Sequence, residues 1–139
     1  MGKKKTPFEM VQEFHRAFKV EGKTKFTEPS PELLRLRGDL IGEELEELSV
    51  EMAKLEKGEN YDPYAIAKEL CDLVYVLLGL ADTLGIPFDK CFKEVHRSNM
   101  SKLDENGNPI YREDGKVIKS NRYSPANLTQ ILQIEERAK

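Results

Sequence analysis

The feature that most constrains this chain is a set of acidic residues on the apolar face of two predicted helices. In residues 31–57, four leucines recur at helical spacing and lie within about 40° of Glu44 around the helix axis. Glu47 lies about 60° from Glu44 on the same stripe, Glu43 lies at its edge, and Glu46 points to water. Ionised carboxylates on a packed face are costly and repel one another. Cations must therefore compensate them.

A second predicted helix, residues 63–84, repeats this arrangement. Glu69 is surrounded by apolar residues at helical spacing, and Asp72 lies about 60° to one side. Each helix therefore offers two carboxylates one turn apart on the same face. Arg37 shares the stripe of Glu44 and can neutralise one of the four acids, but not all of them. Several oxygen ligands together favour a hard divalent ion, Mg²⁺ or Mn²⁺, over zinc.

Other interpretations of these acids fit the sequence less well. A solvated helix face explains any single Glu-x-x-Glu pair, but not four acids on two apolar faces. A ferritin-like di-iron site needs Glu-x-x-His pairs, and His15 and His96 both lie outside the acidic pairs. An EF-hand loop beginning at Asp104 would need glycine at the position of Pro109 and glutamate at that of Gly115.

Periodicity and turn residues predict an all-α chain with a small appendage. The expected long helices cover residues 7–20, 31–57, 63–84 and 87–100. Ser30 and Asp62 are expected to cap two of these helices, and Gly22 to end the first. Turn clusters predict a β-hairpin within about residues 103–123. A short terminal helix is expected to begin at Ser124-Pro125 and to extend through Ile134.

Composition limits the remaining classes. The 139 residues have room for one domain, 1–139, with residues 1–6 expected as a disordered basic terminus. The net charge of −3 argues against a nucleic-acid polymer as partner. The apolar run 73–81 has about half the length of a membrane span, so no membrane association is expected. Cys71 and Cys91 are interpreted as buried hydrophobes, and without a leader a cytoplasmic location is expected.

The helix over residues 63–84 also predicts a partner chain. Its residues 73–80 are apolar on nearly every side, so more than one neighbour must cover them. One chain has only two long helices for such a bundle. A symmetric homo-oligomer that pairs both helices with their copies would bury both stripes. The expected fold is therefore a helical bundle completed by a homo-oligomer, of which a symmetric dimer is the simplest form.

Taken together, these motifs resemble a known superfamily. Glu43-Glu44-Leu45-Glu46-Glu47, followed after 21 residues by Glu69-Leu70-Cys71-Asp72, resembles the Glu-x-x-Glu…Glu-x-x-Asp signature of all-α nucleoside triphosphate pyrophosphohydrolases. That superfamily includes MazG-like proteins, dimeric dUTPases and phosphoribosyl-ATP pyrophosphohydrolases. Residues 13–18, 31–37, 94–102 and 112–116, the last with Lys119, are similar to a bacterial branch intermediate between MazG and dimeric dUTPases.

The resemblance implies hydrolysis of a nucleoside triphosphate between its α- and β-phosphates, which releases a nucleoside monophosphate and pyrophosphate. It implies that Mg²⁺ is held by Glu44, Glu47, Glu69 and Asp72, with Glu43 as the base that prepares the attacking water. It also implies a dimer or tetramer. For the substrate phosphates the candidates are Asn99, Lys102, Lys116 and Lys119, an ordinary surface role being an equal alternative for each lysine.

Some roles remain open at this level. Arg37 would either orient an acid or reach a phosphate. A nucleobase needs a flat apolar wall, for which the candidates are Phe14, Phe18 and Tyr123. His15 is a further candidate because its segment matches the family. Core packing is the alternative for both phenylalanines. The branch favours dUTP or another pyrimidine nucleotide, beside a housecleaning role against aberrant nucleotides. The alternative class is a non-catalytic helical metal-binding or interaction protein on the same bundle.

Overall fold

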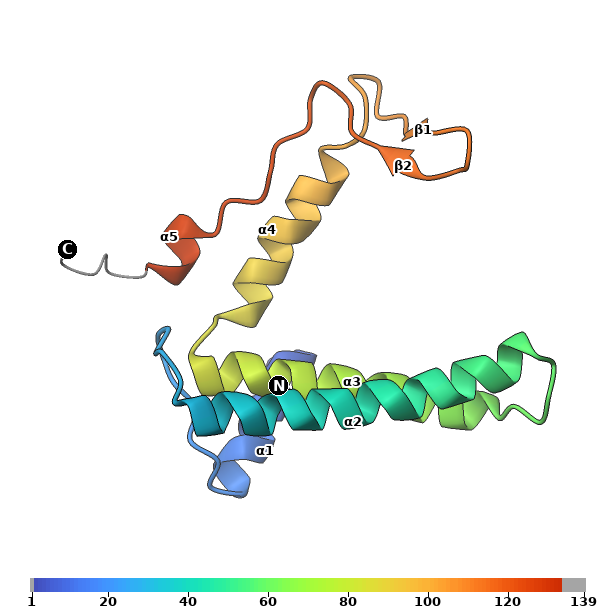
Figure 1. The fold of residues 1–139 in the computed structure, drawn as a ribbon. Coiled ribbons are helices and arrows are strands. Elements are labelled where there is room, and N and C mark those ends of the chain that lie inside the picture. Colours follow the sequence, from blue (N-terminus) through green and yellow to red (C-terminus); the bar gives the residue numbers. More distant parts are fainter. Residues whose placement is uncertain (1, 134–139) are drawn as a thin grey trace. The chain divides into compact units, whose positions relative to one another are not determined.

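The computed structural model describes residues 2–133 (Figure 1). The chain divides into two compact units, Met1–Ile86 and Pro87–Lys139. The first unit holds three helices, α1 (Pro7–Ala17), α2 (Pro31–Glu56) and α3 (Pro63–Leu84). The second unit holds α4 (Phe88–Met100), β1 (Ile110–Tyr111), β2 (Val117–Ile118) and α5 (Thr129–Leu132). The predicted helical fold with a small hairpin is confirmed.

Both predicted caps of the long helices are present. The Ser30 hydroxyl accepts a hydrogen bond from the Leu33 N–H at 3.1 Å, and the Asp62 carboxylate accepts one from the Tyr64 N–H at 2.9 Å. Each cap is followed by a proline, whose missing N–H needs no partner in the first turn. Each cap fixes where one of the two helices that carry the acidic pairs begins.

The first helix is shorter than predicted. It ends at Ala17 rather than near residue 20, and Lys19 turns the chain with a φ of 60°. Gly22 does not stop the helix, because it lies beyond this turn and is packed against Asp82. A Cβ atom at Gly22 would lie 2.6 Å from the Asp82 Oδ1 atom. The expected helix end was therefore wrong, and close packing accounts for the glycine.

The end of α3 is held by the loop that joins α1 to α2. Gly85 caps α3 with a φ of 75°, and a Cβ atom there would lie 1.9 Å from the Lys25 carbonyl oxygen. The Lys23 N–H donates to the Asp82 carbonyl, and the Thr27 N–H donates to the Leu84 carbonyl, both at 2.9 Å. Glycine is required at position 85, since both the backbone conformation and the contact exclude a side chain.

The first unit packs α1 and α2 against α3, and Figure 1 shows α2 and α3 side by side along their length. Its buried apolar side chains are Phe8, Val11, Leu48, Leu78 and Ala81. Many other large apolar side chains of α2 and α3 are exposed in the single chain: Leu34, Leu36, Leu45, Val50, Met52, Leu55, Leu70, Val74 and Leu77. The apolar faces of α2 and α3 are thus only partly covered by the chain itself.

In the second unit the hairpin pairs Ile110 with Ile118 and Tyr111 with Val117, antiparallel. The terminal helix begins at Thr129, so the expected start at Ser124-Pro125 was wrong. Backbone groups of residues 124, 125 and 127 bond to side chains of α4 instead of forming a helical turn. The predicted continuation to Ile134 lies outside the described residues.

The two cysteines differ from each other. Cys91 is buried as expected, and the pKa of its thiol is raised by that burial. Cys71 is exposed on α3, so its interpretation as a buried hydrophobe was wrong. Its position on α3 faces outward because α1 and α2 cover other sides of this helix.

Across residues 2–133, no helix taken singly combines the length and the apolar character that crossing a bilayer requires. Only α3 and α4 counted together, across the break between them, satisfy both criteria.

Candidate metal centre

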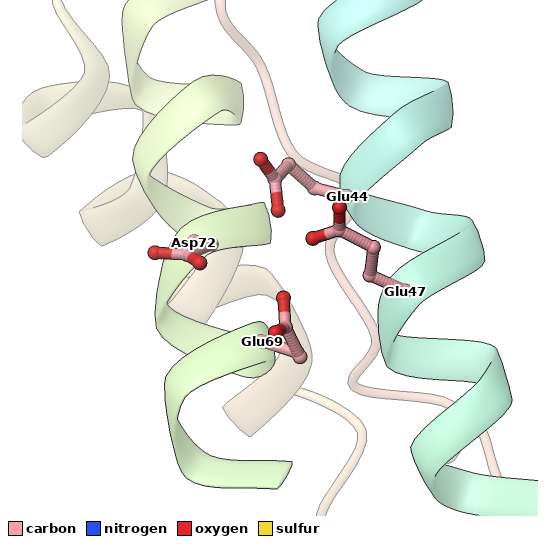
Figure 2. Close-up of side chains that lie close together, drawn as sticks. All are labelled: Glu44, Glu47, Glu69 and Asp72. Carbon is pink, nitrogen blue, oxygen red and sulfur yellow. The ribbon is translucent and has the colours of Figure 1, made fainter. Parts of the chain in front are cut away.

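Four carboxylates from α2 and α3 converge between the two helices (Figure 2). We call Glu44, Glu47, Glu69 and Asp72 the acidic cluster. Each member offers one oxygen, and these oxygens all lie within 4.8 Å of one another. The pairs come from single turns of the two helices, as their i, i+3 spacing requires. Packing of α2 against α3 then brings one pair opposite the other.

The acidic cluster is not neutralised by its own hydrogen bonds. The Oε2 atoms of Glu44 and Glu69 are buried and have no hydrogen-bond partner among residues 2–133. The pKa of Glu69 is raised, chiefly by a hydrogen bond shared with Glu47, and further by burial and by the charges of Glu47 and Asp72. A carboxylate oxygen that has lost water without gaining a donor is stabilised by a cation.

One cation of the chain reaches the edge of the cluster. Lys68 Nζ lies 2.7 Å from Asp72 Oδ2 and 4.0 Å from Glu69 Oε1. The pKa of Lys68 is raised, first by its hydrogen bond to Asp72. The Lys68 side chain is 70% exposed, so this pair lies at the surface. Lys68 was missed from the sequence, although its i, i+4 spacing from Asp72 is a recognisable signal.

The donor set fits a divalent metal ion. Four carboxylates supply only oxygen ligands, and two of their oxygens are buried without partners. Hard cations such as Mg²⁺ and Mn²⁺ prefer oxygen ligands, whereas zinc favours nitrogen and sulfur. The acidic cluster is therefore suited to a hard divalent cation, as the helical spacing predicted.

Glu43 lies beside the cluster without belonging to it. It is exposed and lines a hollow of about 390 Å³ together with Glu47 and Glu69. The other lining residues are Glu46, Val50 and Glu51. Glu46 is exposed, as expected from the spacing, yet it also lines this hollow. Glu43 thus faces open space next to two carboxylates of the acidic cluster.

A second polar group lies elsewhere in this unit, and we call His15, Asp82 and Arg37 the buried triad. These residues are 4%, 6% and 7% exposed. His15 Nδ1 lies 2.6 Å from Asp82 Oδ2. Arg37 Nη1 lies 3.0 Å from where a Gly79 Cβ atom would stand, and Arg37 Nε has no partner among residues 2–133. The triad joins α1, α2 and α3.

The buried triad changes how two candidates are interpreted. Burial lowers the pKa of Arg37, and the charge that opposes this effect belongs to Asp82, not to the acidic cluster. His15 faces the same carboxylate. The structure therefore brings Arg37 and His15 together at Asp82, and it does not bring them to the four clustered acids.

Aromatic side chains of α1 and α3 form an exposed group. The Phe14 ring lies 4.4 Å from Phe18 and 5.6 Å, edge-on, from Tyr75, between ring centroids. Phe18 is 68% exposed, so core packing does not account for it in the single chain. Tyr75 was missed from the sequence. It follows Asp72 by three positions, so it lies one turn from the acidic cluster on α3.

The remaining candidates belong to the second unit. Asn99 is exposed on α4, and Lys116 is exposed beside the hairpin turn. The Lys102 carbonyl accepts a hydrogen bond from the Ser120 N–H at 3.2 Å. Lys119 Nζ lies 4.5 Å from the centroid of the Tyr123 ring. Within this unit the structure therefore brings the Lys119 side chain to Tyr123, and the backbone of Lys102 to that of Ser120.

Comparison with known proteins gives a family match. The family model described as phosphoribosyl-ATP pyrophosphohydrolase matches residues 11–99, a range that contains all of the acidic cluster. No curated protein matches the chain.

Proposed function

This chain belongs to the phosphoribosyl-ATP pyrophosphohydrolase family, within the all-α nucleoside triphosphate pyrophosphohydrolases, and on this premise we propose that it splits nucleoside triphosphates between the α- and β-phosphates. The products would be a nucleoside monophosphate and pyrophosphate. The family comprises hydrolases of phosphoanhydride bonds. The observation that carries the proposal is the convergence of Glu44, Glu47, Glu69 and Asp72 between α2 and α3.

We assign the acidic cluster to Mg²⁺, with Mn²⁺ as a possible substitute. The bound ion would neutralise phosphate oxygens and orient the triphosphate. The chain's part is to hold one oxygen from each of the four carboxylates within 4.8 Å of the others. The Oε2 atoms of Glu44 and Glu69 are buried without a hydrogen-bond partner among residues 2–133. The helices fix this arrangement before the substrate arrives, so little reorganisation is needed.

Glu43 is the proposed general base. Its carboxylate lines the hollow beside Glu47 and Glu69 without being one of the four clustered ligands. It would take one proton from the attacking water while the water oxygen bonds to phosphorus. As this bond forms, the attacked phosphorus loses its bond to the oxygen that bridges the α- and β-phosphates. The leaving phosphate group keeps that bridging oxygen. The exposed edge of the hollow supplies the water.

The substrate's other groups are assigned by proposal to side chains of both units. Phosphate contacts are proposed for Asn99, Lys102, Lys116 and Lys119. Of the two roles open to Arg37, its burial beside Asp82 supports orientation of an acid rather than phosphate contact. Contacts to the nucleobase are proposed for four aromatic side chains: Phe14, Phe18, Tyr75 and Tyr123. His15 is proposed to affect base binding indirectly, through its contact with Asp82.

The preferred base is proposed to be uracil or another pyrimidine, with housecleaning of aberrant nucleotides as the physiological role. A panel of dUTP, dCTP, dTTP and oxidised purine nucleotides, each with Mg²⁺, tests both points. We expect pyrophosphate release, fastest with dUTP. Orthophosphate as the sole product would contradict the cleavage position.

A homodimer or homotetramer is proposed in the cytoplasm. The exposed apolar side chains of α2 and α3 support it, because such helices are normally covered. Light scattering coupled to size-exclusion chromatography should give at least twice the mass of one 16.0 kDa chain. A monomer at micromolar concentration would contradict the assembly.

Replacing Glu43 tests the proposed base. Glu43→Gln keeps the size of the side chain but removes its ability to take a proton. We expect kcat to fall about 10²- to 10⁴-fold while calorimetric Mg²⁺ affinity is kept. Glu56→Gln, at the exposed end of α2, is the matched control and should leave kcat unchanged. Unchanged turnover of Glu43→Gln would remove this role.

The alternative is a non-catalytic metal-binding protein on the same helices. Both alternatives predict that Mg²⁺ binds, so binding alone does not separate them. Pyrophosphate release that requires Mg²⁺ and disappears in Glu43→Gln would support the enzyme. Metal binding without turnover of any nucleotide in the panel would favour the alternative.

A further inference from the structure

One face of α4 carries polar side chains at positions where a packed helix usually carries apolar ones. Glu94, Arg97, Ser98 and Ser101 follow the i, i+3, i+4, i+7 pattern of a single helical face. We call these four residues the polar stripe. Ser98 is only 4% exposed, so the chain covers this face. The cover is residues 120–127, which return along α4 and which we call the return segment.

Two serines bond the middle of the return segment. The Ser124 N–H donates to Ser101 Oγ at 2.8 Å, and Ser98 Oγ donates to the Ser124 carbonyl at 2.8 Å. Both backbone groups of one residue are therefore satisfied by hydroxyls one turn apart on α4. This explains why the chain does not form helix at Ser124, although the sequence suggested a helix start there.

A charged pair bonds the end of the return segment. Arg97 donates to both Glu94 oxygens, at 2.6 and 3.1 Å, and also to the Pro125 carbonyl at 3.2 Å. Glu94 Oε2 accepts the Asn127 N–H at 2.7 Å. The Arg97 guanidinium and the Asn127 N–H lower the pKa of Glu94 to about 2. Glu94 therefore stays ionised and accepts these bonds at neutral pH.

The start of the return segment is bonded next to two proposed phosphate ligands. The Ser120 N–H donates to the Lys102 carbonyl at 3.2 Å, and Ser120 Oγ donates to the Leu103 carbonyl at 2.7 Å. Lys119 directly precedes Ser120, so its backbone is held beside that of Lys102. The Lys119 ammonium lies over the Tyr123 ring, 4.5 Å from its centroid, which orients it further.

We propose that the polar stripe is a set of positioning residues for the triphosphate. By fixing the return segment on α4, it holds the Lys102 and Lys119 backbones together, so that both ammonium groups can meet one polyphosphate. Preorganised cations lose less conformational entropy when the anion binds. This inference rests on the proposed function, in which these two lysines contact phosphates.

Ser101 is the most informative position for a test, because its hydroxyl contacts the return segment directly. Ser101→Ala removes the acceptor of the Ser124 N–H, whereas Ser101→Thr keeps it. Ser49→Ala is the matched control, since the Ser49 hydroxyl bonds only within α2, to the Leu45 carbonyl. Hydrogen exchange should report faster exchange at Ser124 and Asn127 in Ser101→Ala alone. Unchanged exchange would overturn the structural half of the proposal.

The functional half of the proposal is tested by measuring the affinity for inorganic tripolyphosphate calorimetrically in the presence of Mg²⁺. Ser101→Ala should weaken binding about two- to tenfold, the effect of one lost hydrogen bond, with Ser101→Thr near wild type. In turnover, the same variant should raise KM for dUTP and leave kcat within about twofold. Faster exchange with unchanged tripolyphosphate affinity would overturn the proposal, and so would a wild type that does not bind tripolyphosphate.

A double variant separates positioning from a general loss of stability. If Ser101 acts through Lys102, Ser101→Ala should weaken tripolyphosphate binding little further once Lys102→Ala is present. Fully additive losses would contradict positioning. A wild type that binds tripolyphosphate but releases no pyrophosphate from any nucleotide would instead remove the proposed function and leave the binding role of the stripe standing.

Discussion

Two polar groups of the first unit, one between α2 and α3 and the other joining α1, α2 and α3, illustrate two ways in which buried charge is stabilised. The acidic cluster is of one sign, partly exposed, and has two buried oxygens without hydrogen-bond partners among residues 2–133. The buried triad contains both signs, and its members are 4–7% exposed. The chain itself supplies the triad's countercharge, through Asp82 facing His15 and Arg37. In the acidic cluster, Lys68 reaches Asp72 and Glu69 at the edge, and the remaining negative charge is consistent with a divalent metal site.

The largest expected effect is on the stability of the buried triad. Asp82→Ala leaves His15 and Arg37 buried without their carboxylate, so the free energy of unfolding should fall by about 3–5 kcal/mol. Urea denaturation measures this loss. Asp39→Ala, at an exposed position of α2, is the control and should stay within about 0.5 kcal/mol of wild type. A loss below about 1 kcal/mol for Asp82→Ala would remove the contrast between the two groups.

The acidic cluster should respond in the opposite way. Glu47→Gln removes one of four like charges, so without added metal the protein should be as stable as wild type or more stable. Turnover should fall at least about 100-fold, equivalent to roughly 2.7 kcal/mol. The rise in Tm that Mg²⁺ produces should disappear. Thermal melts with and without Mg²⁺ measure the stability and the metal-dependent rise in Tm, and a pyrophosphate assay measures turnover. If Glu47→Gln destabilised the protein as much as Asp82→Ala does, the acidic cluster would be structural, like the buried triad.

A pair of glycine variants tests how tightly the triad is packed. In Gly79→Ala the new Cβ atom would lie 3.0 Å from Arg37 Nη1 and 3.4 Å from His15, so stability should fall by about 1–3 kcal/mol. At Gly38, on α2, nothing lies within 4 Å of such an atom. Gly38→Ala should therefore stabilise the helix by about 0.5–1 kcal/mol. Equal changes in unfolding midpoint for the two variants would contradict close packing at Gly79.

The smallest expected effect concerns Glu94, a carboxylate answered by a cation outside the core. Its pKa is lowered from 4.5 to about 2 in the folded chain. A lowered pKa means that the contribution of Glu94 to stability is complete above about pH 4.5 and declines as the pH falls towards 2. The stability difference between wild type and Glu94→Gln should therefore shrink over that interval. Urea titrations at four pH values test this, and a difference that grows on acidification would refute it.

Local patterns predicted much of the fold and the four residues of the acidic cluster. The cap and proline pairs marked where α2 and α3 begin, because capping depends on neighbouring residues only. Helical spacing placed Glu44 with Glu47 and Glu69 with Asp72, because one turn brings i and i+3 together in any α-helix. Their membership in one cluster followed, since both pairs lie on the faces where α2 meets α3.

The same local reasoning failed where distant residues decide the outcome. The α1 helix ends before Gly22 because the following loop packs on Asp82, which is distant in sequence. The expected helix start at Ser124 is prevented by hydroxyls of α4. Tyr75 and the polar stripe gave no motif, since their partners come from other elements. Such contacts are visible only after the chain has folded.

The sequence by itself determined which residues are acidic, how they are spaced, and that two helices would carry them, because helical geometry is a local property. Only the tertiary structure decided which charged groups would be paired with an opposite charge of the same chain. Packing placed Asp82 against His15 and near Arg37, and it left the Oε2 atoms of Glu44 and Glu69 without a hydrogen-bond partner in the described part of the chain. The physical reason is that neutralising a buried charge depends on what lies a few ångströms away in space, which spacing along one helix does not specify.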